Sequence, residues 1–116
     1  MQQIPIIQCS YQLNLSALNI SATLPLSFRH TLGSQLAEIS FQFFKGVITT
    51  NMTRDMKTKL NKLEELKTKL LVFSMTLRAL KDLKLISYKK HAELSLKVSD
   101  INRQLSGWTK WAKQNS

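Results

Sequence analysis

Residues 56–80 read MKTKLNKLEELKTKLLVFSMTLRAL, and this stretch decides the fold. Its apolar side chains recur at steps of three or four residues, the spacing that aligns them along one side of an α-helix. The seam lasts more than three heptads, so we expect a helix from about 53 to 84, which is ~45 Å long at 1.5 Å per residue. The seam consists of Met56, Leu60, Leu63, Leu66, Leu70, Phe73, Leu77 and Leu80.

Additional apolar residues lie near the middle of this helix, away from the seam. They are Leu71, Val72 and Met75. A helix that is apolar on more than one side packs on more than one side. In a chain of 116 residues we expect the additional face to contact another subunit.

Three further segments have helical periodicity. A helix at about 28–51 is indicated by Leu32, Leu36, Ile39, Phe43 and Val47, widened by Phe41, Phe44 and Ile48, with Asn51 or Thr53 starting the next helix. A last helix at about 87–113, with Ser87 as its N-cap, is indicated by His91, Leu94, Val98, Ile101, Leu105, Trp108 and Ala112.

Residues 7–24 are ambiguous, because Tyr11, Leu13 and Leu15 alternate with polar residues as in a strand. The same segment also fits a helix. One helical face would consist of Ile7, Tyr11, Leu15, Leu18 and Ala22. No second strand is available for pairing, so we predict a helix at about 7–23, ended by Pro25. The sequence thus predicts an all-α protein, a single up-and-down four-helix bundle over residues 1–116.

The charge is strongly positive and unevenly distributed. Lys and Arg number 17 against 7 Asp and Glu, a net charge of +10. Residues 1–50 hold only Arg29, Lys45 and Glu38, so +9 of that charge lies after residue 50. A surface of one sign favours an anionic partner and makes binding depend on salt.

Membrane, secreted and disulfide-bonded classes fit the sequence poorly. Cys9 is the only cysteine, and no stretch approaches the ~20 apolar residues of a spanning helix. Three Asn-x-Ser/Thr sequons are read as chance because the N-terminus lacks a signal-peptide pattern. The sequons are at Asn14, Asn19 and Asn51. We expect a cytoplasmic protein.

No constellation of residues indicates an enzyme, a metal site or a cofactor. His30 and His91 are far apart, and His91 lies on an apolar stripe, where a boundary histidine is the better interpretation. Most acids are expected in i,i+4 ion pairs, each contributing about 0.2–0.5 kcal/mol to a helix. These pairs are Asp55–Lys59, Glu65–Lys69, Arg78–Asp82 and Glu93–Lys97.

Bases outside these pairs, together with Arg78, supply the candidate nucleic-acid-binding residues. Many gather where the third helix is expected to end and the fourth to begin, forming a basic band at one end of the bundle. The candidates are Arg78, Lys81, Lys84, Arg29, Lys89 and Lys90, followed by Lys110 and Lys113. Trp108 continues the apolar stripe and is expected in the core, whereas Trp111 fits either packing or stacking on an unpaired base.

Three motifs carry a family resemblance. They are Leu24-Pro25 with Phe28-Arg29-His30-Thr31-Leu32-Gly33, the run RALKDLKLIS at 78–87, and Leu105-Ser106-Gly107-Trp108. In order and spacing they resemble the accessory variability determinant proteins of bacterial diversity-generating retroelements over about residues 7–113. A four-helix family encoded by intervening sequences in ribosomal RNA genes is similar in architecture.

The resemblance implies a barrel-shaped homopentamer with a basic surface for template RNA or DNA. It also implies a direct complex with the element's reverse transcriptase, in error-prone copying of the template into cDNA, with no catalysis by this subunit. Ser74 stands where that family often carries a further arginine. The alternatives are an adaptor for an acidic protein, a bundle of the intervening-sequence type, a membrane-surface protein and a secreted cytokine-like bundle.

Overall fold

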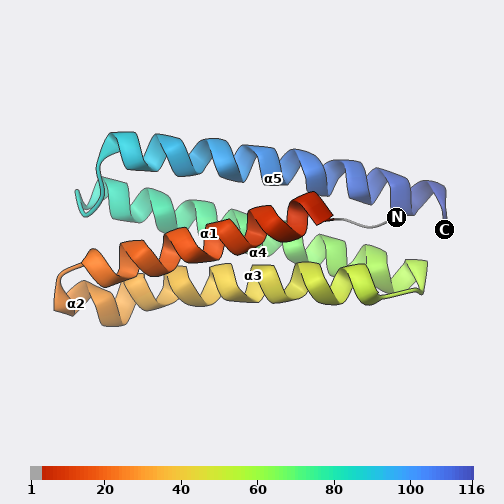
Figure 1. Ribbon diagram of the computed structural model, residues 1–116, viewed down its shortest axis with the longest axis horizontal. Coiled ribbons are helices and arrows are strands. Elements are labelled where there is room, and N and C mark those ends of the chain that lie inside the picture. Colours follow the sequence, from red (N-terminus) through yellow and green to blue (C-terminus); the bar gives the residue numbers. More distant parts are fainter. Residues whose placement is uncertain (1–3) are drawn as a thin grey trace.

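The computed structural model describes residues 4–116 and consists of long helices joined by short connections (Figure 1). The elements are α1 (Ile4–Thr23), α2 (Leu26–Phe28), a π-helical turn η1 (Arg29–Gly33), α3 (Ser34–Met52), α4 (Met56–Asp82) and α5 (Tyr88–Gln114). No strand occurs within these residues. The predicted all-α fold with four long helices is therefore confirmed.

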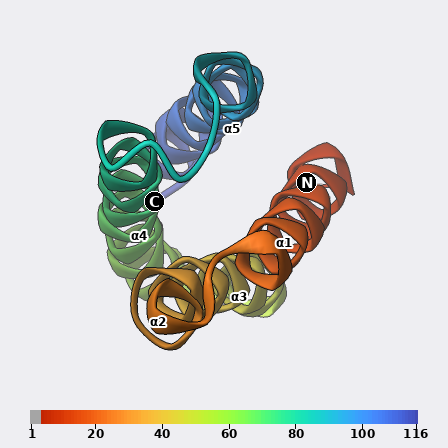
Figure 2. The same ribbon diagram turned by 90° about the vertical axis from the view of Figure 1, so that its left-hand side faces the viewer.

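The four long helices run side by side in a molecule of 46 × 23 × 19 Å. Viewed from the end, they form an arc in the order α1, α3, α4, α5, so that α1 and α4 occupy non-adjacent positions (Figure 2). Gln104 of α5 bridges the two ends of the arc, since its Nε2 donates to Cys9 Sγ of α1 over 3.6 Å.

The core confirms the seam of α4 and the stripe of α5. Six of the eight seam residues of α4 are buried, and the first two, Met56 and Leu60, are partly buried against the core. On α5 the core contains Leu94, Ile101, Leu105, Trp108 and Ala112. The apolar steps of three and four are sufficient to orient these two helices.

In α1 the helical interpretation is right, but the predicted face is wrong. The expected face carries Tyr11, Leu15 and Leu18, which are all exposed. The buried face steps by four and three through Ile6, Ser10, Leu13, Ala17, Ile20 and Leu24. Small residues on this face, Ser10 and Ala17, let α1 lie close to its neighbours. Tyr11, Leu15 and Leu18 consequently point outward.

The helix termini follow local capping chemistry. The Asp55 carboxylate accepts hydrogen bonds from the backbone N–H and the hydroxyl of Thr58, so α4 begins at Met56 and not at the predicted Asn51 or Thr53. Ser87 caps α5 as predicted, accepting from the Lys90 N–H over 3.0 Å. At the other connection, Pro25 separates α1 from α2, and η1 leads without a break into α3.

Residues 4–116 contain no helix with the length and hydropathy required to span a lipid bilayer.

Candidate nucleic-acid interface

The connection between α4 and α5 brings five of the predicted basic residues to one end of the bundle (Figure 1). They are Arg78, Lys81, Lys84, Lys89 and Lys90. We call this group the α4–α5 basic cluster. The acids nearest to it in sequence are Asp82 and Glu93. These five residues therefore lie at one end of the bundle, as the predicted basic band requires.

Lys84 holds the most unusual backbone conformation in the described chain. Its φ is +60°, the only positive value among the described non-glycine residues. The N–H of Leu85 donates to the Leu80 carbonyl and the N–H of Lys84 to the Lys81 carbonyl, which is the Schellman motif that ends a helix. Glycine usually occupies this position because a Cβ costs about 1–2 kcal/mol there. A lysine here places its charge at the tip of the connection at the expense of stability.

Arg78 and Lys81 are partly neutralised by one carboxylate. Asp82 lies 3.7 Å from Arg78 Nε and 3.9 Å from Lys81 Nζ. Lys81 Nζ is also 5.9 Å from the centre of the Tyr88 ring, a cation–π contact. Tyr88 itself is 77% exposed, so one face of an aromatic ring lies open beside the cluster. Tyr88 is not among the binding residues predicted from the sequence.

Lys89 and Lys90 lie in the first turn of α5, and both are exposed. The N-terminus of a helix carries a partial positive charge, so lysines there cost about 0.3–1 kcal/mol each, where acids would stabilise. The unpaired N–H groups, the positive end of the helix dipole and the lysine ammonium groups all place positive charge at this end of α5. This end of α5 is consequently the kind of surface to which an anion binds.

Arg29 lies at the same end of the molecule but not beside the α4–α5 basic cluster. It belongs to η1, which continues from α2, on the side of the end face away from the α4–α5 connection (Figure 2). Its Nη2 donates to the Leu24 carbonyl over 3.0 Å. Part of the guanidinium therefore holds the turn between α1 and α2.

Lys110 and Lys113 lie at the opposite end, near the C-terminus of α5 (Figure 1). Lys59 of α4 is close to them in space, since its Nζ lies 5.7 Å from the centre of the Trp111 ring. Lys59 is only 6% exposed, and Trp111 is half-buried against the core. Trp108 is buried, as predicted. The bases of the predicted set therefore divide between two ends of the bundle.

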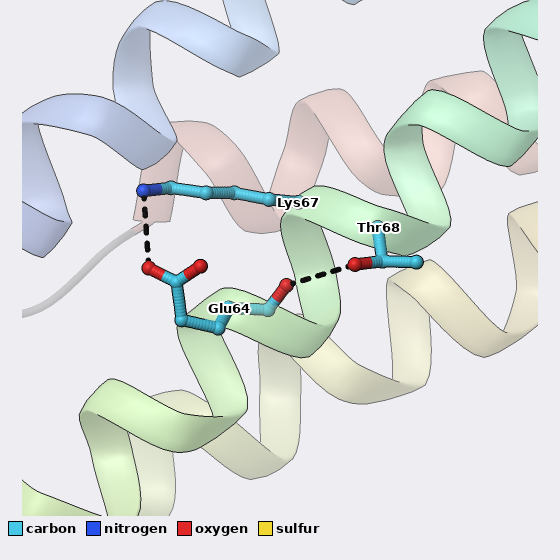
Figure 3. A network of polar contacts seen from close by, with 3 residues as sticks. All are labelled: Glu64, Lys67 and Thr68. Carbon is cyan, nitrogen blue, oxygen red and sulfur yellow. Dashed lines mark hydrogen bonds and ion pairs between the residues drawn. The ribbon is translucent and has the colours of Figure 1, made fainter.

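The predicted ion pairs form only in part. Of the four expected i,i+4 pairs, only Arg78–Asp82 is present within 4.0 Å among residues 4–116. Glu64 instead pairs with Lys67 at 3.5 Å and accepts a hydrogen bond from Thr68 through its carbonyl (Figure 3). The expectations for Asp55–Lys59, Glu65–Lys69 and Glu93–Lys97 are wrong. An exposed ion pair contributes only about 0–1 kcal/mol to stability. A helix cap, a contact with an aromatic ring or an i,i+3 pair can therefore replace it.

Hydrogen bonds from Thr58 make the Asp55 carboxyl more acidic. The Thr58 hydroxyl and then the Thr58 backbone N–H donate to its carboxylate and lower the pKa of Asp55. The described residues contain no group of three His, Cys, Asp or Glu side chains that could hold a metal ion.

A family model described as bAvd-like matches residues 5–112, from the first turn of α1 to the last turns of α5. No curated protein and no solved structure matches the chain.

Proposed function

This chain belongs to the bAvd-like family, and on that premise we propose that it is a non-catalytic accessory subunit of a diversity-generating retroelement. The resemblance found in the sequence is thereby confirmed at the level of the family. In the proposed role the protein binds template RNA or DNA through its basic surface. It partners the element's reverse transcriptase while the template is copied into mutated cDNA.

The observation that carries the nucleic-acid part of the proposal is the α4–α5 basic cluster with Lys84 at its tip. A lysine in place of glycine at a strained backbone position is a reason to suspect a function for its side chain. The strain at Lys84 and the unfavourable placement of Lys89 and Lys90 both lower the stability of the fold. An anionic partner at this end would offset both costs.

The expected mechanism is electrostatic. Lysine and arginine side chains contact phosphates without reading base edges, so the binding positions a strand and does not select its sequence. Each phosphate contact releases counterions, and the affinity falls as salt rises. Tyr88, exposed beside Lys81, can add stacking on an unpaired base.

We also propose that the chain assembles into a homo-oligomer, with five subunits implied by the resemblance. Two exposed apolar faces support this assembly. One consists of Tyr11, Leu15 and Leu18 on α1 with Phe41 on α3, and the other of Leu71, Val72 and Met75 on α4. Because α1 and α4 occupy different sides of the bundle, a contact between unlike faces would be head-to-tail (Figure 2). Contacts of that kind form a ring when the rotation between subunits closes, and the basic cluster would then be repeated around it.

A charge reversal with a matched control tests the nucleic-acid role. Arg78→Glu with Lys84→Glu should abolish RNA binding at moderate salt while leaving helicity unchanged. The control is Arg103→Glu with Lys97→Glu on α5, which changes the net charge by the same amount. It also breaks an equivalent exposed pair, since Arg103 lies 3.3 Å from Asp100. Equal RNA binding by the two double variants would contradict the proposed site.

The partner proposal requires its own measurement. Co-purification of the chain with the element's reverse transcriptase, followed by cDNA synthesis on the template with and without the chain, tests it directly. We expect a stable complex and cDNA synthesis that depends on the chain. If the chain binds an acidic protein but no RNA in a gel-shift titration, the adaptor role would replace the one proposed.

A further inference from the structure

A groove between α3 and α4 gathers three lysines that the predicted binding surface does not include. Lys45 comes from α3, and Lys62 and Lys69 come from α4, two turns apart on the flank that faces α3. The groove has a volume of about 140 Å³, which is several times the ~30 Å³ that one water occupies in the liquid. Its other lining residues are Gln42, Gly46, Thr49, Thr50, Glu65 and Leu66.

The lysines of the groove have no counter-ion among the described residues. The ion pairs of residues 4–116 involve Lys67, Arg78, Lys81 and Arg103, and none of the groove lysines. Glu65 is the only acid in the lining. It is exposed at the edge and pairs with neither Lys62 nor Lys69, although both are within one helical turn. The lining therefore has three positive charges against one negative charge.

The floor of the groove contains a buried hydroxyl without a hydrogen-bond partner. Thr50 is fully buried, and its Oγ1 bonds to no other atom of the described chain. Leaving such a group unsatisfied costs about 1–3 kcal/mol. Thr49, one residue earlier, is satisfied by the Gly46 carbonyl at 3.1 Å. The hydroxyl of Thr50 is thus unsatisfied, but it is closed off from solvent and from a ligand in the groove.

Gly46 sets the depth of the groove. A Cβ at this position would lie 2.7 Å from Leu66 Cδ2, closer than real Cβ contacts. The missing side chain lets α3 lie against α4 at this level. This close approach places Lys45 on one wall of the groove opposite Lys62 and Lys69 on the other wall.

We propose that this α3–α4 groove binds a phosphate group, with Lys45, Lys62 and Lys69 as its counter-ions. A phosphate offers several acceptor oxygens, which matches three ammonium groups. Its source is either the backbone of a nucleic-acid strand or a free phosphate compound. The first source rests on the proposed function, and the second does not.

A matched exchange of two neighbouring carboxylates gives the sharpest test. Glu65→Gln removes the acid that lines the groove, whereas Glu64→Gln makes the same charge change one residue away. Glu64 points to the other flank of α4, where it pairs with Lys67 (Figure 3). Two charges ~4 Å apart in water interact by about 1 kcal/mol, so Glu65→Gln should tighten binding about two- to fivefold at low salt. Glu64→Gln should leave it unchanged within twofold.

The lysines supply the opposite change. Lys62→Gln with Lys69→Gln should weaken binding about tenfold and reduce the dependence of affinity on salt, whereas Lys67→Gln, which removes one charge outside the groove, should do neither. Thr50→Val keeps the shape of the side chain and removes its hydroxyl. It should leave binding unchanged within twofold, because the hydroxyl is closed off from the groove, and the free protein should become no less stable, because an unsatisfied group is removed.

Two probes distinguish the sources and separate this inference from the proposed function. Pyrophosphate is titrated by calorimetry and a 20-nucleotide RNA by fluorescence anisotropy, each against the full chain and its variants. Groove-dependent RNA binding supports a strand as the ligand, and groove-dependent pyrophosphate binding supports the site even if RNA does not bind at all. If both probes respond equally to Glu65→Gln and Glu64→Gln, the groove is not a site, while loss of RNA binding by Arg78→Glu with Lys84→Glu would still support the proposed function.

Discussion

Replacing Lys84 by glycine should make the protein more stable and a poorer ligand for RNA. The φ of +60° at this residue places its Cβ against the backbone, at a cost of about 1–2 kcal/mol. Glycine removes that strain, but it also increases the conformational entropy of the unfolded chain. This second effect lowers the stability by about 0.4–1 kcal/mol. We therefore expect a net stabilisation of about 0.5–1 kcal/mol.

The stabilisation can be converted to a melting temperature. Unfolding entropy near 60 °C is about 2.1 cal/mol/K per residue, so for this length the Tm should rise by about 2–4 °C. Thermal denaturation followed by circular dichroism, at fixed protein concentration, measures it. Lys84→Ala is the control, because it removes the charge and keeps the Cβ. It should not share the increase in Tm.

Binding should change in the other direction. Both variants lose one positive charge, so both should bind RNA more weakly, with a shallower salt dependence by about 0.7 for each lost phosphate contact. Equal melting temperatures for Lys84→Gly and Lys84→Ala would show that the backbone at this position is not strained. Undiminished RNA binding by both variants would show that the charge at the tip is not used.

Three further predictions concern stability and assembly. Gly107→Ala should raise the free energy of unfolding by about 0.5–1 kcal/mol in a urea titration, because a Cβ there meets no atom within 4 Å. Gly33→Ala should lower it by about 1–3 kcal/mol, because its Cβ would lie 2.8 Å from a side-chain oxygen. Asp55→Asn should lower the Tm at neutral pH. Because the folded pKa of Asp55 is lowered, that difference should be complete above about pH 4 and vanish as the pH falls through the folded value. Leu15→Lys or Met75→Lys should reduce the mass measured by light scattering to that of one chain, and an unchanged mass for both would contradict the proposed apolar interfaces.

The fold was predictable where one face of a helix is distinctly more apolar than the others. In α4 and α5 the apolar steps identify the buried side, and the caps at Asp55 and Ser87 are local chemistry. In α1 every face carries apolar residues and no charge marks the outside. The choice of face then depends on how closely α1 can lie against its neighbours, which favours Ser10 and Ala17. Those are contacts between helices, and single-helix periodicity contains no information about them.

The candidate binding surface was likewise predictable only in part. The α4–α5 basic cluster follows from sequence because its members lie close together along the chain. The prediction grouped this cluster with Arg29, Lys110 and Lys113 because of their charge alone, and the structure places these three residues elsewhere. The α3–α4 groove was missed because Lys45 is 17 or more residues from its partners. The one available signal is the spacing of seven between Lys62 and Lys69, which places both on one flank of a helix whose buried side is known.

Helix α4 carries two features on its outer sides that are unfavourable in a lone chain without a ligand. One side packs in the core, and the flank toward α3 carries Lys62 and Lys69 over the groove. The outward side carries Leu71, Val72 and Met75, of which Leu71 is 62% exposed and Met75 54%. An apolar outer face lowers the solubility of a lone chain, and like-charged lysines repel one another without a ligand. The apolar face becomes favourable when another subunit covers it, and the lysines become favourable when an anion occupies the groove. Assembly and phosphate binding therefore account for opposite flanks of one helix in the same way.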